Sequence, residues 1–232
     1  MRVLILANND VGLYKFRREL LSELLVPGSY IEDRVADPWE VYISLPNGEM
    51  VPEMIKMGCE FIETPIERHG TNPLEELKLR KQYKRIIRDV KPNIVFSYTI
   101  KPNIYGGMAC KALKVPCIMN ITGLGTAVEN GGLMQKFMLM LYKLALPGAR
   151  KVFFQNNENE QFFVDHKLAM GKHDMLPGSG VNLSHYTVSE YPPEDTIEFA
   201  FISRIMKEKG IDQYLDAAKA IRAKYPQTRF HI

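Results

Sequence analysis

Residues 93–103 read Asn-Ile-Val-Phe-Ser-Tyr-Thr-Ile-Lys-Pro-Asn, and this stretch indicates the architecture of most of the chain. Its first half is a run of β-branched and aromatic residues, apolar on both faces. Its second half turns polar before a proline and the pair Gly106-Gly107. A strand buried on both sides and followed by a helix is typical of a parallel sheet covered by helices. Comparable runs occur, with helical patterns between them, at 2–7, 40–45, 60–66, 116–122 and 151–156. The sequence therefore predicts an α/β fold with a Rossmann-like, doubly wound parallel sheet.

The predicted helices follow from capping residues and apolar periodicity. Asn72, Pro73 and Glu75 form one helix start, and Asn157 with Glu160 forms a second. Further helical stretches are expected at about 14–25, 104–113 and 133–146.

Two of these predicted helices have side chains that could contact a membrane surface or a nucleic acid. The stretch 133–146 is rich in Met, Leu and Phe and is flanked by Lys136, Lys143, Arg150 and Lys151. It fits either a buried core helix or a segment that lies on an anionic membrane surface. The basic residues between 78 and 88 mostly lie opposite an apolar stripe, which favours a solvated face over a nucleic-acid contact.

The chain is predicted to have two parts joined by a linker. Residues 1–176 form the first domain, and residues 177–195, rich in Pro, Gly, Ser and Asn, form the linker. Residues 196–232 restart the strand-helix-strand rhythm. One β-α-β unit cannot bury its own sheet, so we expect it to be the start of a truncated second domain. The alternative is an appendage that docks on the first domain.

Composition excludes several classes of protein. The 232 residues are 46% hydrophobic and 25% charged, values that are ordinary for a globular protein and that exclude disorder, collagen-like repeats and a coiled-coil rod. The net charge of +3, from 30 basic and 27 acidic residues, is too balanced for a dedicated nucleic-acid binder. Three cysteines without a CxxC pair indicate a reducing cytosol, and no apolar run approaches the roughly 18 residues of a membrane span.

Candidate site residues lie where the predicted strands end, because ligands of open α/β sheets bind beyond the carboxyl ends of the strands. Amide, hydroxyl and carboxylate side chains there can bind the hydroxyls of a sugar. The alternatives are ordinary turn chemistry for the loops and, at the start of the helix predicted from Asn157, a capping role for Glu160 and a favourable interaction of Glu158 with the helix dipole. In chain order the candidates are Gly12, Tyr98, Thr99, Lys101, Asn103, Asn120, Thr122, Gly123, Asn156 and Glu158.

Arg204 and Lys209 follow a strand of the second part, where their positive charges could neutralise a departing diphosphate. The alternative is a solvated basic turn. Neither a DxD nor an HExxH motif occurs, and we expect no metal and no other cofactor.

Five ordered strings together resemble bacterial retaining glycosyltransferases of the two-domain GT-B fold, which build capsule, O-antigen and glycan precursors. They span almost the whole chain and comprise Tyr98 to Gly106, Asn120 to Gly125, Phe153 to Asn156, Pro177 to Asn182, and Ser203-Arg204 with Lys209-Gly210.

The resemblance implies a division of labour between the two domains. The amino-terminal domain takes a glycan or lipid-linked acceptor at the cytoplasmic face of the membrane, and the other domain takes most of a nucleotide sugar. Gly12 then lies near the donor diphosphate, while Arg204 and Lys209 match the basic pair that stabilises this diphosphate as it leaves.

The chain departs from the family pattern in two places. Tyr98 or Thr99 stands where many relatives have a histidine, and the paired-glutamate motif of the later carboxyl-terminal domain is absent. We therefore expect the 232-residue chain alone to transfer little or no sugar. Two rival hypotheses are a nucleotide-sugar 2-epimerase of the same architecture and the non-catalytic half of a split glycosyltransferase.

Overall fold

The computed structural model describes residues 1–26, 30–31, 34–35, 39–67, 72–125, 128, 131–190 and 196–232. The chain divides into two compact units, Met1–Gly180 and Val181–Ile232. The division falls inside the stretch 177–195 that the sequence predicts as a linker.

Unit 1 is built around a seven-stranded parallel sheet with the order β5-β4-β1-β6-β7-β8-β9. The predicted doubly wound α/β fold is confirmed. Its strands are β1 (Arg2–Leu6), β4 (Glu40–Leu45), β5 (Glu60–Glu63), β6 (Ile94–Tyr98), β7 (Cys117–Ile121), β8 (Ala149–Phe154) and β9 (His173–Met175). A separate two-stranded antiparallel pair comprises β2 (Tyr30–Ile31) and β3 (Arg34–Val35).

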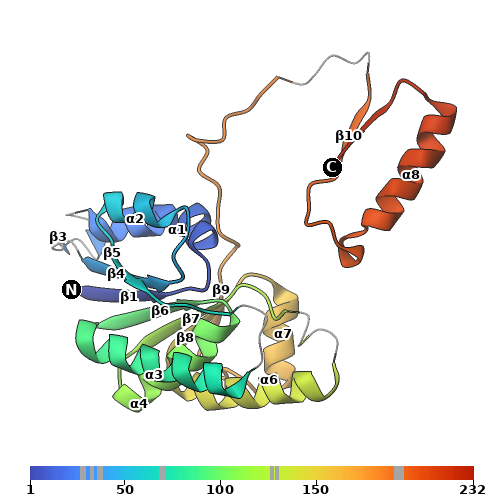
Figure 1. The fold of residues 1–232 in the computed structure, drawn as a ribbon. Helices are drawn as coiled ribbons and strands as arrows, with labels where there is room; N and C mark the ends of the chain where they lie inside the picture. Colours follow the sequence, from blue (N-terminus) through green and yellow to red (C-terminus); the bar gives the residue numbers. More distant parts are fainter. Residues whose placement is uncertain are drawn as a thin grey trace. The chain divides into compact units, whose positions relative to one another are not determined.

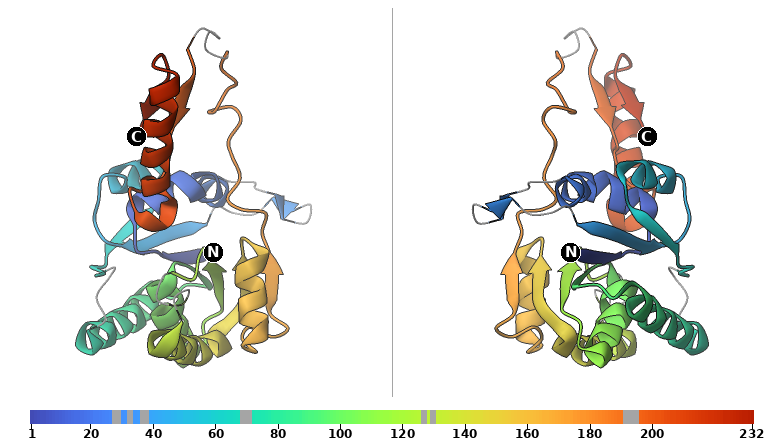
Figure 2. Two further views of the ribbon diagram at one scale, coloured as in Figure 1. Left: turned by 90° about the vertical axis from the view of Figure 1, so that its right-hand side faces the viewer. Right: turned by 90° about the vertical axis from the view of Figure 1, so that its left-hand side faces the viewer.

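Helices cover both faces of the sheet (Figures 1 and 2). On one face lie α1 (Asp10–Leu25) and α2 (Val51–Met57). On the other lie α3 (Pro73–Val90), the π-helical turn η1 (Pro102–Gly106), α4 (Gly107–Leu113), α6 (Gly132–Ala145), the 3-10 turn η2 (Leu146–Gly148) and α7 (Asn157–Asp165).

Alternation along β1 explains the two layers. Val3 and Ile5 pack into the hydrophobic cluster beneath α1 and α2, whereas Leu4 and Leu6 pack into the larger cluster beneath the other helices. Because successive side chains of a strand point to opposite faces, a strand that is apolar at every position must be covered on both sides.

The helix ends follow the chemistry of the local sequence, with one correction. Asn9 and Asn72 cap α1 and α3, and their side chains accept backbone hydrogen bonds from the first turn. At α7, however, the cap is Asn156 rather than the predicted Asn157, and its side chain accepts from the Asn159 backbone N–H at 2.8 Å.

Unit 2 contains one β-α-β arrangement. Its elements are β10 (Glu198–Ala200), the 3-10 turn η3 (Lys207–Lys209), α8 (Ile211–Lys224) and β11 (Arg229–His231). The two strands pair in parallel, and the rings of Phe199 and Phe230 stack with centroids 4.7 Å apart. The predicted strand-helix-strand rhythm is therefore present here.

Candidate functional site

The strand order creates a switch point at the carboxyl ends of β1 and β6. From β1 the sheet continues through β4 to β5 in one direction and through β6 to β9 in the other. The loops that leave β1 and β6 therefore diverge to opposite faces of the sheet, and such a point is where open α/β sheets bind their ligands.

The turn after β1 is held by its own side chains. The Asn9 side chain accepts a hydrogen bond from the backbone N–H of Gly12, the residue predicted to lie near the donor diphosphate, so this N–H is already engaged within the turn. Asp10 is buried and accepts from the Met50 backbone N–H at 2.8 Å. Gly48 leaves room for this carboxylate, because an added Cβ there would overlap it. The β4–α2 turn is thereby fixed against the start of α1, a contact that no sequence motif indicates.

The end of β6 carries the clearest backbone outlier of the site. Thr99 has φ +71°, in the left-handed region, which is a costly conformation for a β-branched residue. Its hydroxyl donates to the Tyr98 carbonyl oxygen. Strained residues of this kind persist only where the surrounding structure holds them in place, and they cluster at ligand sites. Thr99 therefore marks the switch point as a candidate site.

Tyr98 lies directly beneath this turn and is almost fully buried. The Arg17 guanidinium carbon is 4.9 Å from the centroid of its ring, a cation–π arrangement. Burial raises the pKa of the Tyr98 hydroxyl, and the Arg17 charge opposes that rise. The phenol thus stays neutral, with a cation from α1 beside it.

Lys101 is engaged in a largely buried ion pair. Its Nζ lies 2.6 Å from Oε1 of Glu76, in the first turn of α3, and the two side chains are only 16% and 14% exposed. Within the described part of the chain, Oε2 of Glu76 is buried without a hydrogen-bond partner. Burial and the nearby Glu76 carboxylate raise the pKa of Tyr105. The ammonium predicted to bind substrate is thus already paired with a carboxylate, and it ties the loop after β6 to α3.

Asn103 and Asn120 form a buried amide network with Ser97. The Ser97 hydroxyl donates to Oδ1 of Asn103 at 2.7 Å, and Nδ2 of Asn103 donates to the Asn120 carbonyl oxygen at 2.9 Å. Nδ2 of Asn120 lies 3.5 Å from the Ser97 carbonyl oxygen. Both side chains face protein partners, so in this geometry they position the ends of β6 and β7.

The loop after β7 is the accessible part of this edge. Thr122 is exposed, and around Gly123 nothing lies within 4 Å of where a Cβ would be. Gly125 has φ +76°, and a Cβ there would lie 2.9 Å from Cδ1 of Ile100. The loops after β6 and β7 therefore touch, which brings Thr99 and Thr122 to one edge of the sheet.

The turn after β8 adds one accessible carboxylate. The side-chain oxygen of Asn156 is used in capping α7, whereas Glu158 in the first turn of that helix is exposed. Glu160 is engaged differently, with Oε1 2.8 Å from Nδ1 of His173 on β9. The Glu158 carboxylate therefore faces solvent at this turn, beside Asn156, which is also exposed.

Arg204 and Lys209 lie in unit 2, after the carboxyl end of β10. Both side chains are exposed, and Lys209 is the last residue of η3. Gly210 follows with φ +81°, which turns the chain into α8. Both cations thus precede α8 in the chain, and the start of a helix is a place suited to an anion.

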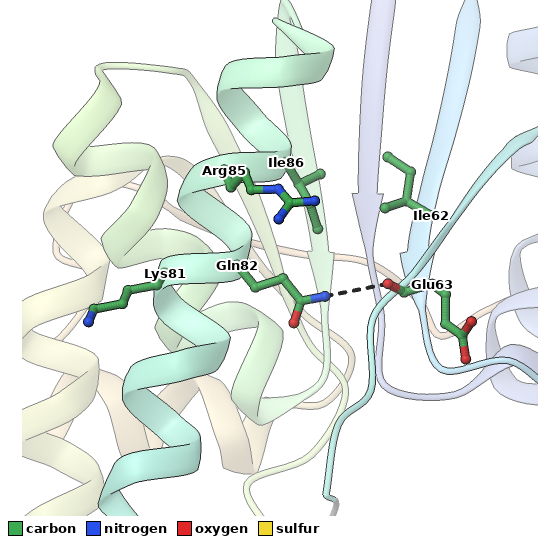
Figure 3. Close-up of a pocket in the computed structure, with 6 residues that line it drawn as sticks. All are labelled: Ile62, Glu63, Lys81, Gln82, Arg85 and Ile86. Carbon is green, nitrogen blue, oxygen red and sulfur yellow. Dashed lines mark hydrogen bonds between the residues drawn. The ribbon is translucent and has the colours of Figure 1, made fainter.

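A groove of about 390 Å³ lies away from this edge, between β5 and α3 (Figure 3). The side chains that line it are drawn there, and Nε2 of Gln82 donates to the Glu63 carbonyl oxygen at 3.4 Å. The groove is shallow and lies two strands from β1, so we place the candidate site at the switch point. In the ranges that the structure describes, no three His, Cys, Asp or Glu side chains gather closely enough to hold a metal ion.

Comparison with known proteins identifies the family. Residues 30–156 match the pattern of a family described as glycosyl transferase 4-like. This chain belongs to that family. The match includes the loops after β6 and β7 and ends at Asn156, so Gly12, Glu158, Arg204 and Lys209 lie outside it.

One curated relative of this glycosyl transferase 4-like chain is a transferase, and the solved structures of similar fold include epimerases. A Campylobacter jejuni protein named N,N'-diacetylbacillosaminyl-diphospho-undecaprenol alpha-1,3-N-acetylgalactosaminyltransferase is 23% identical over 241 residues, which cover 97% of this chain and 61% of that protein. The structure of Anabaena HepE in complex with UDP and glucose aligns with a TM-score of 0.68 at 14% identity, over 99% of this chain and 60% of that one. A UDP-GlcNAc 2-epimerase from Neisseria meningitidis, bound to UDP-GlcNAc, aligns with a TM-score of 0.62 at 12% identity, over 99% and 64%. The chain thus spans about three fifths of the length of these relatives, and the structural likeness shows the fold alone.

Proposed function

We propose that this chain is the acceptor-side part of a glycosyltransferase. The enzyme transfers a sugar from a nucleotide-diphosphate sugar to a glycan or lipid-linked acceptor in cell-surface polysaccharide biosynthesis, with retention at the anomeric carbon. Membership of the glycosyl transferase 4-like family, which residues 30–156 match, supports the assignment as a transferase. The strained Thr99 at the switch point supports the placement of the site in this unit.

The acceptor side rests on the accessible groups of unit 1. Thr122 offers a hydroxyl that can donate and accept, Gly123 leaves open space for a sugar ring, and Glu158 offers a carboxylate. The Campylobacter relative acts, by its name, on a sugar carried by diphospho-undecaprenol. We extend that acceptor class to this chain, and with it a place at the cytoplasmic face of the membrane.

The proposed donor site depends on the positive charges of Arg204 and Lys209. Loss of a nucleoside diphosphate builds negative charge on the leaving oxygen, and Arg204 and Lys209 would offset it without a metal ion. Removal of one such donor typically costs about 3 kcal/mol or more, so in the complete enzyme Arg204→Ala should slow transfer roughly 100- to 1000-fold. Lys219→Ala, which changes an exposed cation on α8, is the matched control and should leave the rate unchanged.

The 2-epimerase hypothesis keeps the same architecture and is favoured only by fold neighbours such as the Neisseria meningitidis enzyme. It is tested by incubating the complete enzyme with UDP-GlcNAc in the absence of any acceptor. An epimerase would produce the 2-epimer or its hydrolysis product, detected by chromatography. A transferase would leave the sugar configuration unchanged.

The location of the acceptor site is tested by photo-crosslinking with a farnesyl-diphosphate-linked N-acetylglucosamine that carries a diazirine on the sugar. We expect adducts on peptides containing 99–103, 122–125 or 155–160, which the unlabelled analogue should suppress. Glu158→Gln should weaken binding of the analogue about 10-fold, because a hydrogen bond to a charged carboxylate is replaced by a weaker one to a neutral amide. Glu60→Gln, at the start of β5 and thus at the opposite edge of the sheet, is the control. Adducts confined to the groove in Figure 3 would refute this placement.

A further inference from the structure

Helix α6 exposes an apolar stripe. Leu133, Phe137, Met140 and Leu144 follow one another at helical spacing and are 85%, 47%, 49% and 50% exposed, and neighbouring Met134 is 42% exposed. Tyr142 and Ala145 are the two fully buried residues of this helix. The alternative of a mostly buried core helix, left open by the sequence, is therefore wrong. Contiguous exposed apolar side chains on a folded domain mark an interaction surface.

The charged residues on α6 and in the segments that flank it in the chain are all positive. Between Asn130 and Asn157 the sequence contains no Asp or Glu, while Lys136, Lys143 and Arg150 are exposed. Across the described ranges, no carboxylate forms an ion pair with either lysine of α6. The surface thus combines an apolar band with an uncompensated positive rim.

We propose that α6 docks on an anionic lipid bilayer, with its axis parallel to the surface. Leu133, Phe137 and Leu144 enter the acyl boundary, and Lys136 and Lys143 reach the lipid phosphates. A bilayer fits better than a second copy of the chain, because a twofold contact through α6 would bring its uncompensated lysines against each other. No helix in the described ranges is long and apolar enough to cross a membrane. The contact is therefore a surface one.

The docking surface adjoins the candidate site. Helix α6 follows the loop after β7, and Nε2 of its Gln135 donates to the Val128 carbonyl oxygen in that loop at 2.8 Å. Its first exposed apolar side chain, that of Leu133, comes eight residues after Gly125 in the chain. If the proposed function holds, docking of α6 brings this edge of the sheet to the plane where the diphosphate of a lipid-linked acceptor lies. The lipid-docking proposal itself depends only on the exposed apolar stripe and the two lysines of α6.

Vesicle co-sedimentation of the 232-residue chain tests the proposal. The wild-type chain should pellet with phosphatidylglycerol-containing vesicles and much less with pure phosphatidylcholine. Each lysine near an anionic surface contributes roughly 5-fold in binding, so Lys136→Glu with Lys143→Glu should weaken binding about 25-fold or more. Phe137→Gln with Leu144→Gln should weaken it by roughly 10-fold or more, since both side chains are half exposed and available to lipid.

Matched controls come from α1, on the opposite face of the sheet. Lys15→Glu and Phe16→Gln change an exposed lysine and a 59% exposed phenylalanine there, and neither should alter vesicle binding. An unchanged urea midpoint shows that each variant is folded. A wild-type chain that stays in the supernatant with anionic vesicles would overturn the proposal, as would equal losses from the α1 and α6 variants.

A fluorescent label gives a second measurement that does not depend on weakened binding. The chain's own cysteines are buried, so Leu144→Cys can be labelled selectively with an environment-sensitive dye. The emission should shift to the blue on anionic vesicles, while the same dye at Phe16→Cys should not respond. A shift that depends on protein concentration without lipid would indicate self-association and contradict lipid docking. Vesicle binding without binding of an acceptor analogue would refute the proposed function and leave this proposal intact.

Discussion

Replacement of Lys101 by Met should strongly destabilise unit 1. The Lys101 ammonium lies 2.6 Å from the Glu76 carboxylate, and about six sevenths of each side chain is buried. Oε2 of Glu76 already lacks a hydrogen-bond partner among the described residues. Without Lys101, a buried carboxylate would remain with no opposite charge beside it. Loss of one partner of a buried ion pair typically costs about 3–5 kcal/mol. Because the Lys101–Glu76 pair is partly exposed, we expect Lys101→Met to lower the free energy of unfolding by about 3 kcal/mol.

The adjacent pair Lys78–Glu75 is an internal control. Its two charged atoms are 2.7 Å apart, but the side chains are 72% and 49% exposed. Exposed pairs contribute about 0 to 1 kcal/mol, so Lys78→Met should lower the free energy of unfolding by less than about 1 kcal/mol. The double variant Lys101→Met with Glu76→Met should recover most of the loss, because an apolar pair of similar volume leaves no charge buried.

Urea unfolding followed by tryptophan fluorescence measures all three variants. Trp39, the one tryptophan of the chain, packs against the cluster beneath α1 and α2 and therefore reports on unit 1. Linear extrapolation gives each free energy of unfolding. Equal losses from Lys101→Met and Lys78→Met would refute the argument that burial makes the Lys101 pair important. A double variant less stable than Lys101→Met would refute it as well.

Three further predictions use the same titration. Gly148→Ala should cost about 2 kcal/mol, because a Cβ there would lie 2.5 Å from the Gly107 carbonyl oxygen and backbone cannot swing aside; a loss below roughly 0.5 kcal/mol would contradict this packing. Thr99→Gly should stabilise by up to about 1 kcal/mol by relieving the left-handed strain at φ +71°, and a clear destabilisation would argue against strain. Burial raises the pKa of Cys59 from 9.0 to about 11, so between these values the unfolded chain loses a proton that the folded chain keeps, and stability falls as pH rises. The fall is at most about 1.4 kcal/mol per pH unit for this thiol, and Cys59→Ala should reduce the measured slope, whereas an unchanged slope would assign it to other groups.

The fold was largely predictable because the same sequence pattern, an apolar strand followed by a helix, recurs along the chain. Most strands of the main sheet are apolar on both faces, although β5 begins and ends in an exposed glutamate, and the caps Asn72 and Pro73 mark α3 without ambiguity. The misses are short or polar elements. Strand β9 has three residues, His173–Met175, and joins the sheet only through its pairing with β8. Such an edge strand has no periodicity to detect.

The candidate site was predictable in place but not in detail. Thr99, Thr122 and Glu158 each follow a strand in the sequence. Because the strands are parallel, residues that follow them lie at the same edge of the sheet. The same rule selected Lys101 and Asn103, whose polar groups face protein partners. A sequence does not distinguish an amide or ammonium that meets a ligand from one that closes an internal network, because both need the same residue types. The strain at Thr99 is likewise a property of the backbone and has no residue signature.

Calorimetric titration of the purified chain tests the central claim most directly. One titration uses the farnesyl-diphosphate-linked N-acetylglucosamine and the other uses UDP-GlcNAc. An acceptor-side part of a glycosyltransferase should bind the lipid-linked analogue saturably and the nucleotide sugar weakly or not at all. Tight binding of UDP-GlcNAc without binding of the lipid-linked analogue would contradict the account and would assign unit 1 to a nucleotide-sugar enzyme that needs no acceptor.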